Sequence, residues 1–312
     1  MDPLHVWKTV FVVIYFIVSI VGTFSNSLVV YIIRKNIKRL PASSYLIISM
    51  VFSNLLSCSV PVPFSIAVYY QQSWPFGMAG CRSHAFMIFF LGLVTITHLT
   101  IIAVEKYLTI NRSLSKHSYF TKKQIGQLIL ACWIYSLAFS LAPLLGWSKY
   151  GMEGTNFACS IQWNSSLPGD HAYFALMFFA CFFLPVVSIA FCYYKIHKVS
   201  KHIVERTMSY GETMNTALLR KHRRAAMYFS SVIIAYLISW SPYAVVSILA
   251  IFKVKIHPLV PTCCGVFAKI SFLLNPVTYV AFSSNFRRHL MKAFTNSSRK
   301  RLTLKLRRKE LQ

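Results

Sequence analysis

Long apolar runs alternate with short polar segments along the whole chain. Each run has about 20 residues or more without period-two alternation, which is long enough for a helix to cross a hydrocarbon core of ~30 Å. Only helices and closed barrels satisfy every backbone polar group in lipid, and unalternating runs of this length exclude a barrel. We therefore predict an all-α bundle of seven transmembrane helices, over residues 7–33, 43–68, 81–108, 124–146, 171–195, 222–251 and 259–282.

The composition indicates one membrane domain with little mass outside the bilayer. Hydrophobic residues make up 56% of the 312 residues and charged residues only 13%, about half the charged fraction of a typical soluble domain. We expect a single domain over residues 1–312. Residues 283–294 ("SSNFRRHLMKAF") are typical of a short amphipathic helix on the inner membrane surface, and residues 295–312 of a basic cytoplasmic tail.

The net charge of +26 follows the topology and does not indicate nucleic-acid binding. Of the 33 Lys and Arg residues, 27 lie on the loops and span ends of one side, whereas only five lie on the other. The positive-inside rule then predicts a multi-pass plasma-membrane protein with an extracellular N-terminus and a cytoplasmic C-terminus. The basic tail should also be attracted to anionic membrane lipid.

Two cysteines and one sequon lie on the predicted outer side. Cys81 opens the third span and Cys159 lies in the loop before the fifth. Both face an oxidising compartment, so we expect a disulfide that pins this loop to the third helix. Asn164, in Asn-Ser-Ser, is a candidate glycosylation site.

Lys269 is the most unusual residue of the predicted spans. It lies ten residues from the outer end of the last span, or about 15 Å deep, and a lysine stem cannot reach the interface from there. An isolated cation at that depth costs at least ~2.5–3.5 kcal/mol. The only acid within the spans is Glu105, at the inner end of the third. Lys269 is therefore a neutral structural amine in a hydrated cavity, or a nucleophile consumed in a covalent bond to a carbonyl.

Several motifs, in order and spacing, resemble those of one receptor family. They are Asn26 in "GTFSNSLVV", "WPFG" just before Cys81, "VEKYLTI" at 104–110, "SWSPY" at 239–243 and "FAKISFLLNPVTY" at 267–279. Across essentially its whole length the chain resembles an opsin, a G-protein-coupled receptor of the rhodopsin class. "VEKYLTI", "CSIQW" and "WSPY" resemble the non-visual peropsin, neuropsin and photoisomerase branch.

The resemblance implies a retinal site. Lys269 occupies the position at which opsins bind retinal as a Schiff base, and the loop tied by Cys81 and Cys159 resembles the lid over the chromophore. Aromatic walls suit a polyene ligand. The pocket residues implied are Trp240, Tyr243, Gly92, Met177 and Phe182.

The counterion differs from that of visual pigments. His84 occupies the position where those proteins carry an acid, and the only outer acid near the implied pocket is Glu153. One hypothesis is that Glu153 supports a protonated, visible-absorbing Schiff base. The other, which we favour, is a neutral Schiff base that absorbs in the near ultraviolet.

The implied activation switch is also altered. The motif at the end of the third span is Glu105-Lys106-Tyr107, and lysine lacks the planar donor fork of the usual arginine. His222 stands where the sixth helix usually supplies an acid, so we expect a weak ionic lock, with raised basal activity or relaxed coupling. The remaining residues that the resemblance implies for activation are Tyr193, Asn275, Pro276 and Tyr279.

Three functions remain open at this point. The first is a photoreceptor, with no enzymatic or metal site, that activates a heterotrimeric G protein and has arrestin and a receptor kinase as further implied partners. The second is a retinal photoisomerase with little signalling, favoured by His84 and Lys106 but disfavoured by the intact "NPVTY". The third is a receptor for a diffusible ligand.

Overall fold

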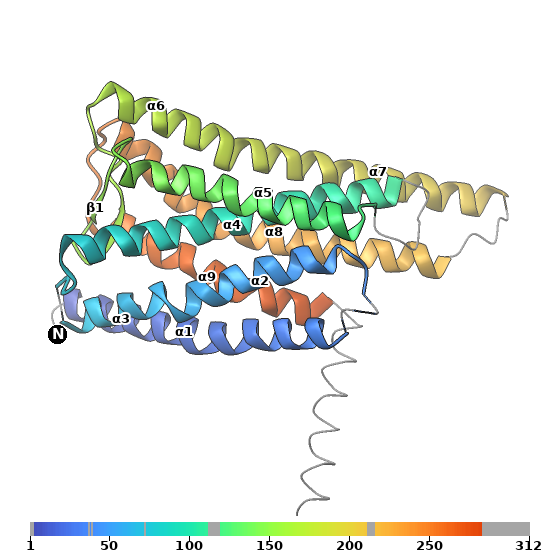
Figure 1. Cartoon of the computed structure of the whole chain (residues 1–312), viewed down its shortest axis with the longest axis horizontal. Helices are drawn as coiled ribbons and strands as arrows, with labels where there is room; N and C mark the ends of the chain where they lie inside the picture. The colour runs from blue at the N-terminus through green and yellow to red at the C-terminus, as the bar shows by residue number, and fades with distance from the viewer. Residues whose placement is uncertain are drawn as a thin grey trace, which may run out of the picture.

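The computed structural model describes residues 3–36, 38, 40–71, 73–111, 119–210 and 216–282. Only the backbone is described at residues 3–6, 200, 202–229, 232, 275 and 277–282. The predicted amphipathic helix and the basic tail lie outside the described residues. The described chain forms a bundle of long helices with one small hairpin at one end (Figure 1).

Seven helical passes make up the bundle, as the apolar pattern predicts. Six of the described helical stretches are long and apolar enough to cross a membrane, and the seventh has a shorter described apolar part, Leu259–Leu274. The helices are α1 (Pro3–Asn36), α2 (Ser44–Ser59) with α3 (Pro61–Gln71), α4 (Gly77–Asn111), α5 (Lys122–Leu141), α6 (Pro168–Met177) with α7 (Leu184–Tyr210), α8 (Thr216–Ile251) and α9 (Leu259–Phe282).

Two passes are interrupted for local reasons. Between α2 and α3, the chain breaks at Val60, just before Pro61, which has no N–H to donate to the preceding turn. Between α6 and α7, residues Phe178–Phe183 form a π-helical segment, η3. Such bulges often lie at functional sites because they re-aim the side chains of one turn.

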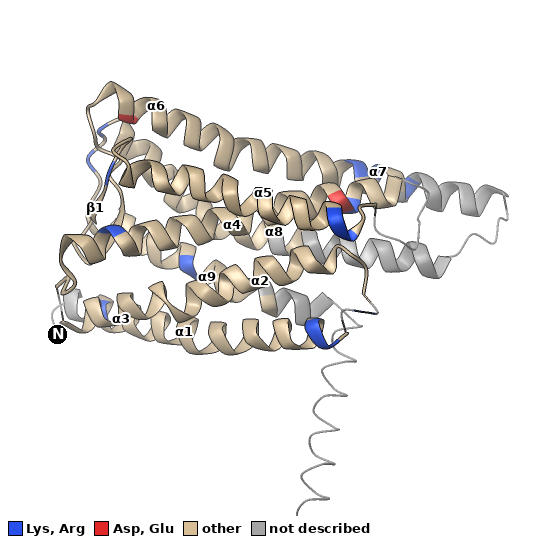
Figure 2. Ribbon diagram, in the orientation of Figure 1, with Lys and Arg blue, Asp and Glu red and all other residues tan. Residues whose placement is uncertain are grey.

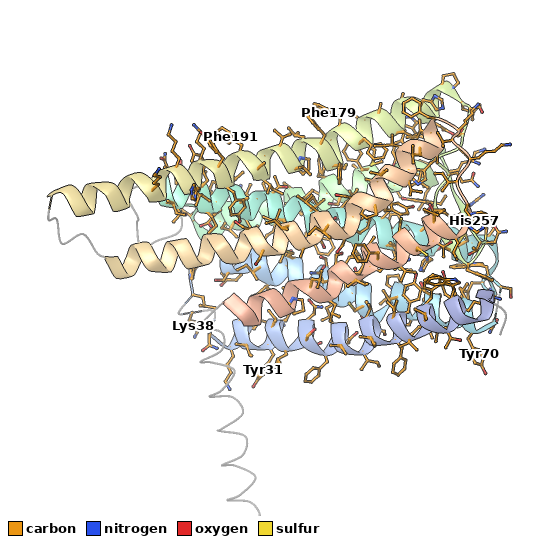
Figure 3. The ribbon with its side chains drawn as sticks, turned by 180° about the vertical axis from the view of Figure 1, so that it is seen from behind. Tyr31, Lys38, Tyr70, Phe179, Phe191 and His257 are labelled. Carbon is orange, nitrogen blue, oxygen red and sulfur yellow. A yellow bond between two sulfur atoms is a disulfide. The ribbon has the colours of Figure 1, made fainter. Side chains whose placement is uncertain are left out.

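The helix α4 lies at the centre of the bundle and packs against α2, α5, α7 and α8. The outer faces carry large apolar side chains: Phe179 and Phe191 point away from the bundle and are 57% and 51% exposed (Figure 3). Asn26 is buried and donates from Nδ2 to the Phe272 carbonyl at 3.1 Å, which ties α1 to α9. Apolar side chains on the outside and a buried amide that links two helices on the inside suit a helix bundle in lipid.

The loop between α5 and α6 forms the hairpin. Strands β1 (Tyr150–Glu153) and β2 (Ala158–Ile161) pair antiparallel, with Glu153 opposite Ala158. Cys159 of β2 is bonded to Cys81 in the first turns of α4, with a Cα–Cα distance of 5.5 Å. The disulfide expected from the sequence is confirmed.

The two ends of the bundle differ in their content of Lys and Arg (Figure 2). Lys and Arg gather where α1 and α4 finish and α5 begins, and we call this the basic end. The opposite end, which carries β1 and β2, is the hairpin end. The helices run alternately between the two, so the described charges follow the asymmetry expected from the sequence.

Candidate functional site

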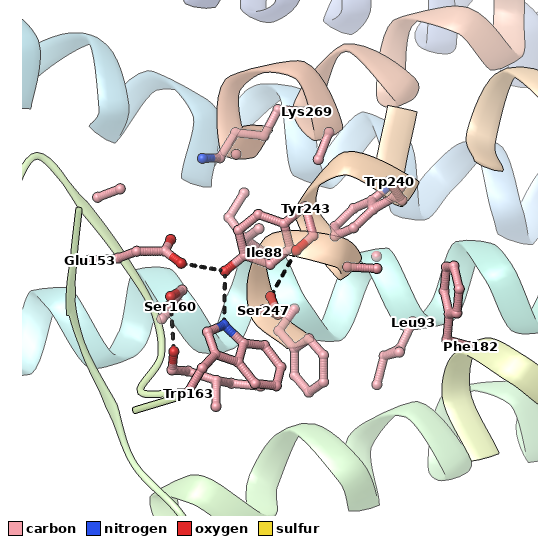
Figure 4. A pocket seen from close by; sticks show the side chains of 18 of the residues that line it. Ile88, Leu93, Glu153, Ser160, Trp163, Phe182, Trp240, Tyr243, Ser247 and Lys269 are labelled. Carbon is pink, nitrogen blue, oxygen red and sulfur yellow. Dashed lines mark hydrogen bonds between the residues drawn. The ribbon is translucent and has the colours of Figure 1, made fainter. Parts of the chain in front are cut away.

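A cavity lies inside the bundle near the hairpin end, between α4, α8, α9, the π-helical segment and the hairpin (Figure 4). Its walls are mostly aromatic and aliphatic. Eight residues named from the sequence line it together: Lys269, Glu153, Cys159, Trp240, Tyr243, Gly92, Met177 and Phe182.

Lys269 projects from α9 into this cavity and is only 6% exposed. Its Nζ donates a hydrogen bond to the Tyr15 hydroxyl of α1 at 3.3 Å and lies 5.3 Å from the centre of that ring. Among the described residues, no carboxylate lies within 4.0 Å of Nζ. A phenol accepts this hydrogen bond without supplying a formal charge, so the described contacts of the amine include no ion pair.

Glu153 faces the same space from the tip of β1 (Figure 4). Its Oε1 accepts a hydrogen bond from the Tyr243 hydroxyl at 3.0 Å, and Trp163 Nε1 donates to that hydroxyl at 3.4 Å. Burial raises the pKa of the Glu153 carboxyl to about 7, and the hydrogen bond from Tyr243 and the charge of Lys269 offset this only in part. The folded protein therefore keeps this carboxyl protonated to a higher pH than an exposed glutamate.

The hairpin is held over the cavity at both of its edges. The disulfide fixes β2 to α4, while the turn after β1 rests on the start of α9. Thr155 Oγ1 lies 3.2 Å from Thr262 Oγ1. Gly154 has φ +58°, and a Cβ there would lie 2.6 Å from both the Pro258 carbonyl and Thr262 Oγ1. Only glycine allows this close approach, so the turn is built to close the cavity against α9.

His84 does not line the cavity. Its Nε2 lies 3.3 Å from Ser65 Oγ, and its ring packs edge-on against Trp74, with 5.3 Å between ring centres. The hydrogen-bond partner of the Lys269 amine is Tyr15, and His84 as a counterion candidate stays a prediction. The imidazole is turned towards α3 by the hydroxyl of Ser65.

Trp240 closes the inner side of the cavity against α4 and α9. Its Nε1 donates to Ser271 Oγ at 3.0 Å, and its ring stacks on Tyr236, whose hydroxyl donates to the Gly92 carbonyl at 3.1 Å. A Cβ added at Gly92 would lie 3.1 and 3.2 Å from two ring carbons of Trp240. The absence of a side chain at Gly92 thus allows the indole to sit directly against α4.

We expect Gly92→Ala to lower the free energy of unfolding by about 1–3 kcal/mol, because the new methyl overpacks against Trp240. Thermal melting of the ligand-free protein measures this. Gly126→Ala in α5 is the matched control, since nothing lies within 4 Å of the added Cβ there, and it should not destabilise. Trp240→Phe, which lacks the two crowded carbons, should relieve the defect. Additive effects in the Gly92→Ala/Trp240→Phe double variant would contradict this contact.

The residues proposed for activation lie at the basic end. Lys106 Nζ pairs with Glu105 at 2.8 Å and donates to Ser43 Oγ, at the start of α2, at 3.2 Å. Tyr107 and Tyr193 pack in one cluster around Ile110 and Ile196. Pro276 lies within α9. The side chains of Asn275, Tyr279 and His222 lie outside the described residues, so the predicted weakness of the ionic lock stays a prediction.

Asn164, the candidate glycosylation site, is exposed just after β2 at the hairpin end. This places it far along the bundle from the basic end, on the side predicted to be extracellular.

The cavity can hold an apolar carbonyl compound. Aromatic rings of Trp240, Tyr243 and Phe182 offer walls for an extended π-system, and the Lys269 amine is the one nitrogen nucleophile among its lining residues. The described residues include no group of three or more side chains suited to a metal ion. These residues fit retinal, the ligand that the sequence resemblance implies.

Tyr15 and Trp163 are among the residues of the site that were not found from the sequence. Tyr15 precedes Lys269 by 254 positions, and Trp163 lies 80 positions before Tyr243. An acid was the partner expected for Lys269, whereas the available signal for Tyr15 was a hydroxyl-bearing aromatic residue in the outer half of the first span.

The comparisons with known proteins agree on one family. Residues 25–279 match the family model described as "7 transmembrane receptor (rhodopsin family)". Human melanopsin is 32% identical over 297 residues, covering 91% of this chain and 61% of its own length. Melanopsin-A of Danio rerio is 31% identical over 294 residues, covering 91% of this chain and 49% of its own length.

A solved structure shares the fold. The crystal structure of squid rhodopsin superposes with a TM-score of 0.85 at 24% identity, covering 95% of this chain and 89% of that one. The chain spans about half to three-fifths of the length of the melanopsins it matches. These relatives are melanopsins, so the likeness to the peropsin and neuropsin branch stays a prediction.

Proposed function

This chain belongs to the rhodopsin family of seven-transmembrane receptors, and from that premise we propose that it is a non-visual opsin, a retinal-binding photoreceptor that activates a heterotrimeric G protein. One observation supports this most strongly: a buried lysine amine projects into an aromatic cavity beneath a disulfide-pinned lid. The named relatives are melanopsins and a rhodopsin, which gives no support to the photoisomerase alternative.

Retinal, when bound, supplies a conjugated polyene that absorbs light and isomerises, and an aldehyde carbon that condenses with a lysine amine, with loss of water, to a Schiff base. Lys269 is the residue that would hold it covalently. Trp240, Tyr243 and Phe182 would hold the polyene, while the hairpin excludes water from above. Exclusion of water protects such a linkage from hydrolysis and strengthens local electrostatics.

Movement of Trp240 would transmit a structural change in the cavity to the basic end. The indole lies on α8 beside Pro242, and its contacts reach both α4 and α9. A push on this ring would act on α8 at a proline, where the helix lacks one backbone hydrogen bond and bends most readily. We propose that the basic end, which this motion would open, is cytoplasmic and receives the G protein.

The test of this function is light-dependent nucleotide exchange. The protein, reconstituted with 11-cis or all-trans retinal in lipid, should accelerate nucleotide exchange on a heterotrimeric G protein more strongly on illumination than in darkness or without retinal. Exchange that ignores both light and retinal would reject the photoreceptor and favour a receptor for a diffusible ligand.

We expect the reconstituted protein to absorb mainly in the near ultraviolet. Glu153 is the carboxyl of the cavity, but burial raises its pKa to about 7, and it lies beyond 4.0 Å of the Lys269 amine. It is therefore a weak partner for a cation on that nitrogen. An absorption spectrum in darkness measures this. A dominant visible band that disappears in Glu153→Gln would instead establish Glu153 as an effective counterion.

The stability of the ligand-free protein should fall as pH rises from about 4.5 to about 7. The folded protein keeps the Glu153 proton up to a pKa of about 7, whereas the unfolded chain loses it near the ordinary value of 4.5. Between these values the folded state binds more protons, so deprotonation disfavours it by up to about 3 kcal/mol. Melting temperatures at pH 5 and pH 8 measure the effect. Glu153→Gln should shrink the difference, and an unchanged difference would show that another group titrates.

A further inference from the structure

A second hollow lies on the outside of the bundle, at the basic end and far from the lysine cavity. It is a shallow groove between the last turns of α1 and the neighbouring part of α2. Tyr31 marks its position on the outer side of α1 (Figure 3). The groove is lined by Ser27, Val30, Tyr31, Arg34, Lys35 and Leu55.

The groove joins an apolar wall to two cations. Val30, Tyr31 and Leu55 form the wall, and Arg34 and Lys35 stand at its mouth in the last turn of α1. Lys35 Nζ lies 5.6 Å from the centre of the Tyr31 ring and donates to its hydroxyl at 3.5 Å. This contact keeps the ammonium of the exposed Lys35 beside the Tyr31 ring of the apolar wall.

No described carboxylate neutralises these cations. Neither Arg34 nor Lys35 forms an ion pair within 4.0 Å with any described Asp or Glu. The described acid of this end, Glu105, is 1% exposed and pairs with Lys106 inside the bundle. The groove mouth is therefore a site of uncompensated positive charge, visible at the end of α1 in Figure 2.

The groove lies at the depth where lipid headgroups meet acyl chains. The candidate span of α1 runs from Trp7 to Asn36, so Arg34 and Lys35 stand at its end, at the membrane–water boundary. Val30 and Leu55, nearer the middle of the bundle, face the acyl region. A ligand that fills the groove must be apolar along one part and anionic at the other.

We propose that this groove binds an anionic phospholipid of the adjoining leaflet. Arg34 presents a planar fork of donors that suits two phosphate oxygens, and Lys35 adds a second positive charge. One acyl chain lies along Val30, Tyr31 and Leu55. A soluble phosphate would leave the apolar wall uncovered, and a zwitterionic lipid would bring its own cation towards Arg34 and Lys35.

Lipid binding to the full-length protein in detergent, followed by native mass spectrometry, tests the site. The probes are phosphatidylglycerol, phosphatidylcholine with the same acyl chains, and glycerol phosphate. Each cation of such a site contributes about a fivefold gain in affinity, so Arg34→Gln/Lys35→Gln should weaken phosphatidylglycerol binding about 25-fold. Leu55→Trp, which fills the apolar wall and leaves both cations in place, should weaken it as well.

The matched control is Lys122→Gln/Lys123→Gln. These exposed lysines start α5 at the same end and carry the same charge, but they do not line the groove. The control should change binding less than about twofold. Equal losses in the two double variants would show diffuse surface charge and overturn the site. Equal binding of phosphatidylcholine, or displacement of the lipid by glycerol phosphate, would overturn the assignment to an anionic phospholipid.

Discussion

We expect Lys269→Ala to abolish the retinal-dependent absorption band of the reconstituted protein and, with it, every response to light. The cavity keeps its aromatic walls in this variant, but it loses the nitrogen nucleophile among its lining residues. Shortening the lysine side chain to alanine also removes a buried polar group, so the ligand-free protein should remain folded. The variant therefore loses the covalent attachment of retinal and not its fold. An absorption spectrum measures the attachment, and a melting curve measures the fold.

Two controls sharpen this expectation. Lys255→Ala removes a lysine that is exposed at the hairpin end, and it should leave the band intact. Tyr15→Phe keeps the amine but removes the hydroxyl that accepts its hydrogen bond, so retinal should still bind while the band shifts. If Lys269→Ala signals as strongly as the unaltered protein, the chain responds to a diffusible ligand and the retinal account is wrong.

Cutting the disulfide should have the second largest effect. We expect Cys159→Ala to lower the free energy of unfolding by about 2–5 kcal/mol, because the bond closes a long loop and fixes the hairpin to α4. The same hairpin carries Glu153 over the cavity, so pigment formation should fail as well. Thermal melting and retinal binding after purification measure the two effects.

The chain offers a matched control for this substitution. Cys263 is a free cysteine near the start of α9, so Cys263→Ala makes the same chemical change at the hairpin end without cutting a bond. It should form pigment normally. Normal pigment in Cys159→Ala would show that the contacts of Gly154 and Thr155 with α9 hold the lid by themselves.

Much of the fold could be predicted because lipid restricts the choices. Runs of apolar residues in a bilayer become helices, and the alternation of basic loops orders their directions. The side chains around the cavity could be named by resemblance, since motifs such as "SWSPY" and "FAKISFLLNPVTY" fix their depth on helices of regular rise. To name these side chains, it was enough to know how far along its helix each one lies.

What the sequence could not give is which side chains meet between distant elements. His84 points to Ser65 of α3, and Lys269 donates to Tyr15 of α1, because helix rotation and tilt decide these contacts. The register of β1 and β2 brings Glu153 beside Tyr243, and an apolar pattern carries no information on a short loop hairpin. The π-helical turn at Phe178–Phe183 likewise lies in a uniformly apolar run, where the spacing of apolar and polar residues cannot indicate it.

The most direct test of the central claim is to locate the bound retinal chemically. The protein is reconstituted with 11-cis retinal in darkness, reduced with borohydride to fix any imine, digested and examined by mass spectrometry. We predict a retinyl mass on the peptide that carries Lys269, one per protein, with surface lysines such as Lys122 and Lys255 unlabelled. A label spread over surface lysines, or retinal that copurifies without any covalent label, would contradict the account.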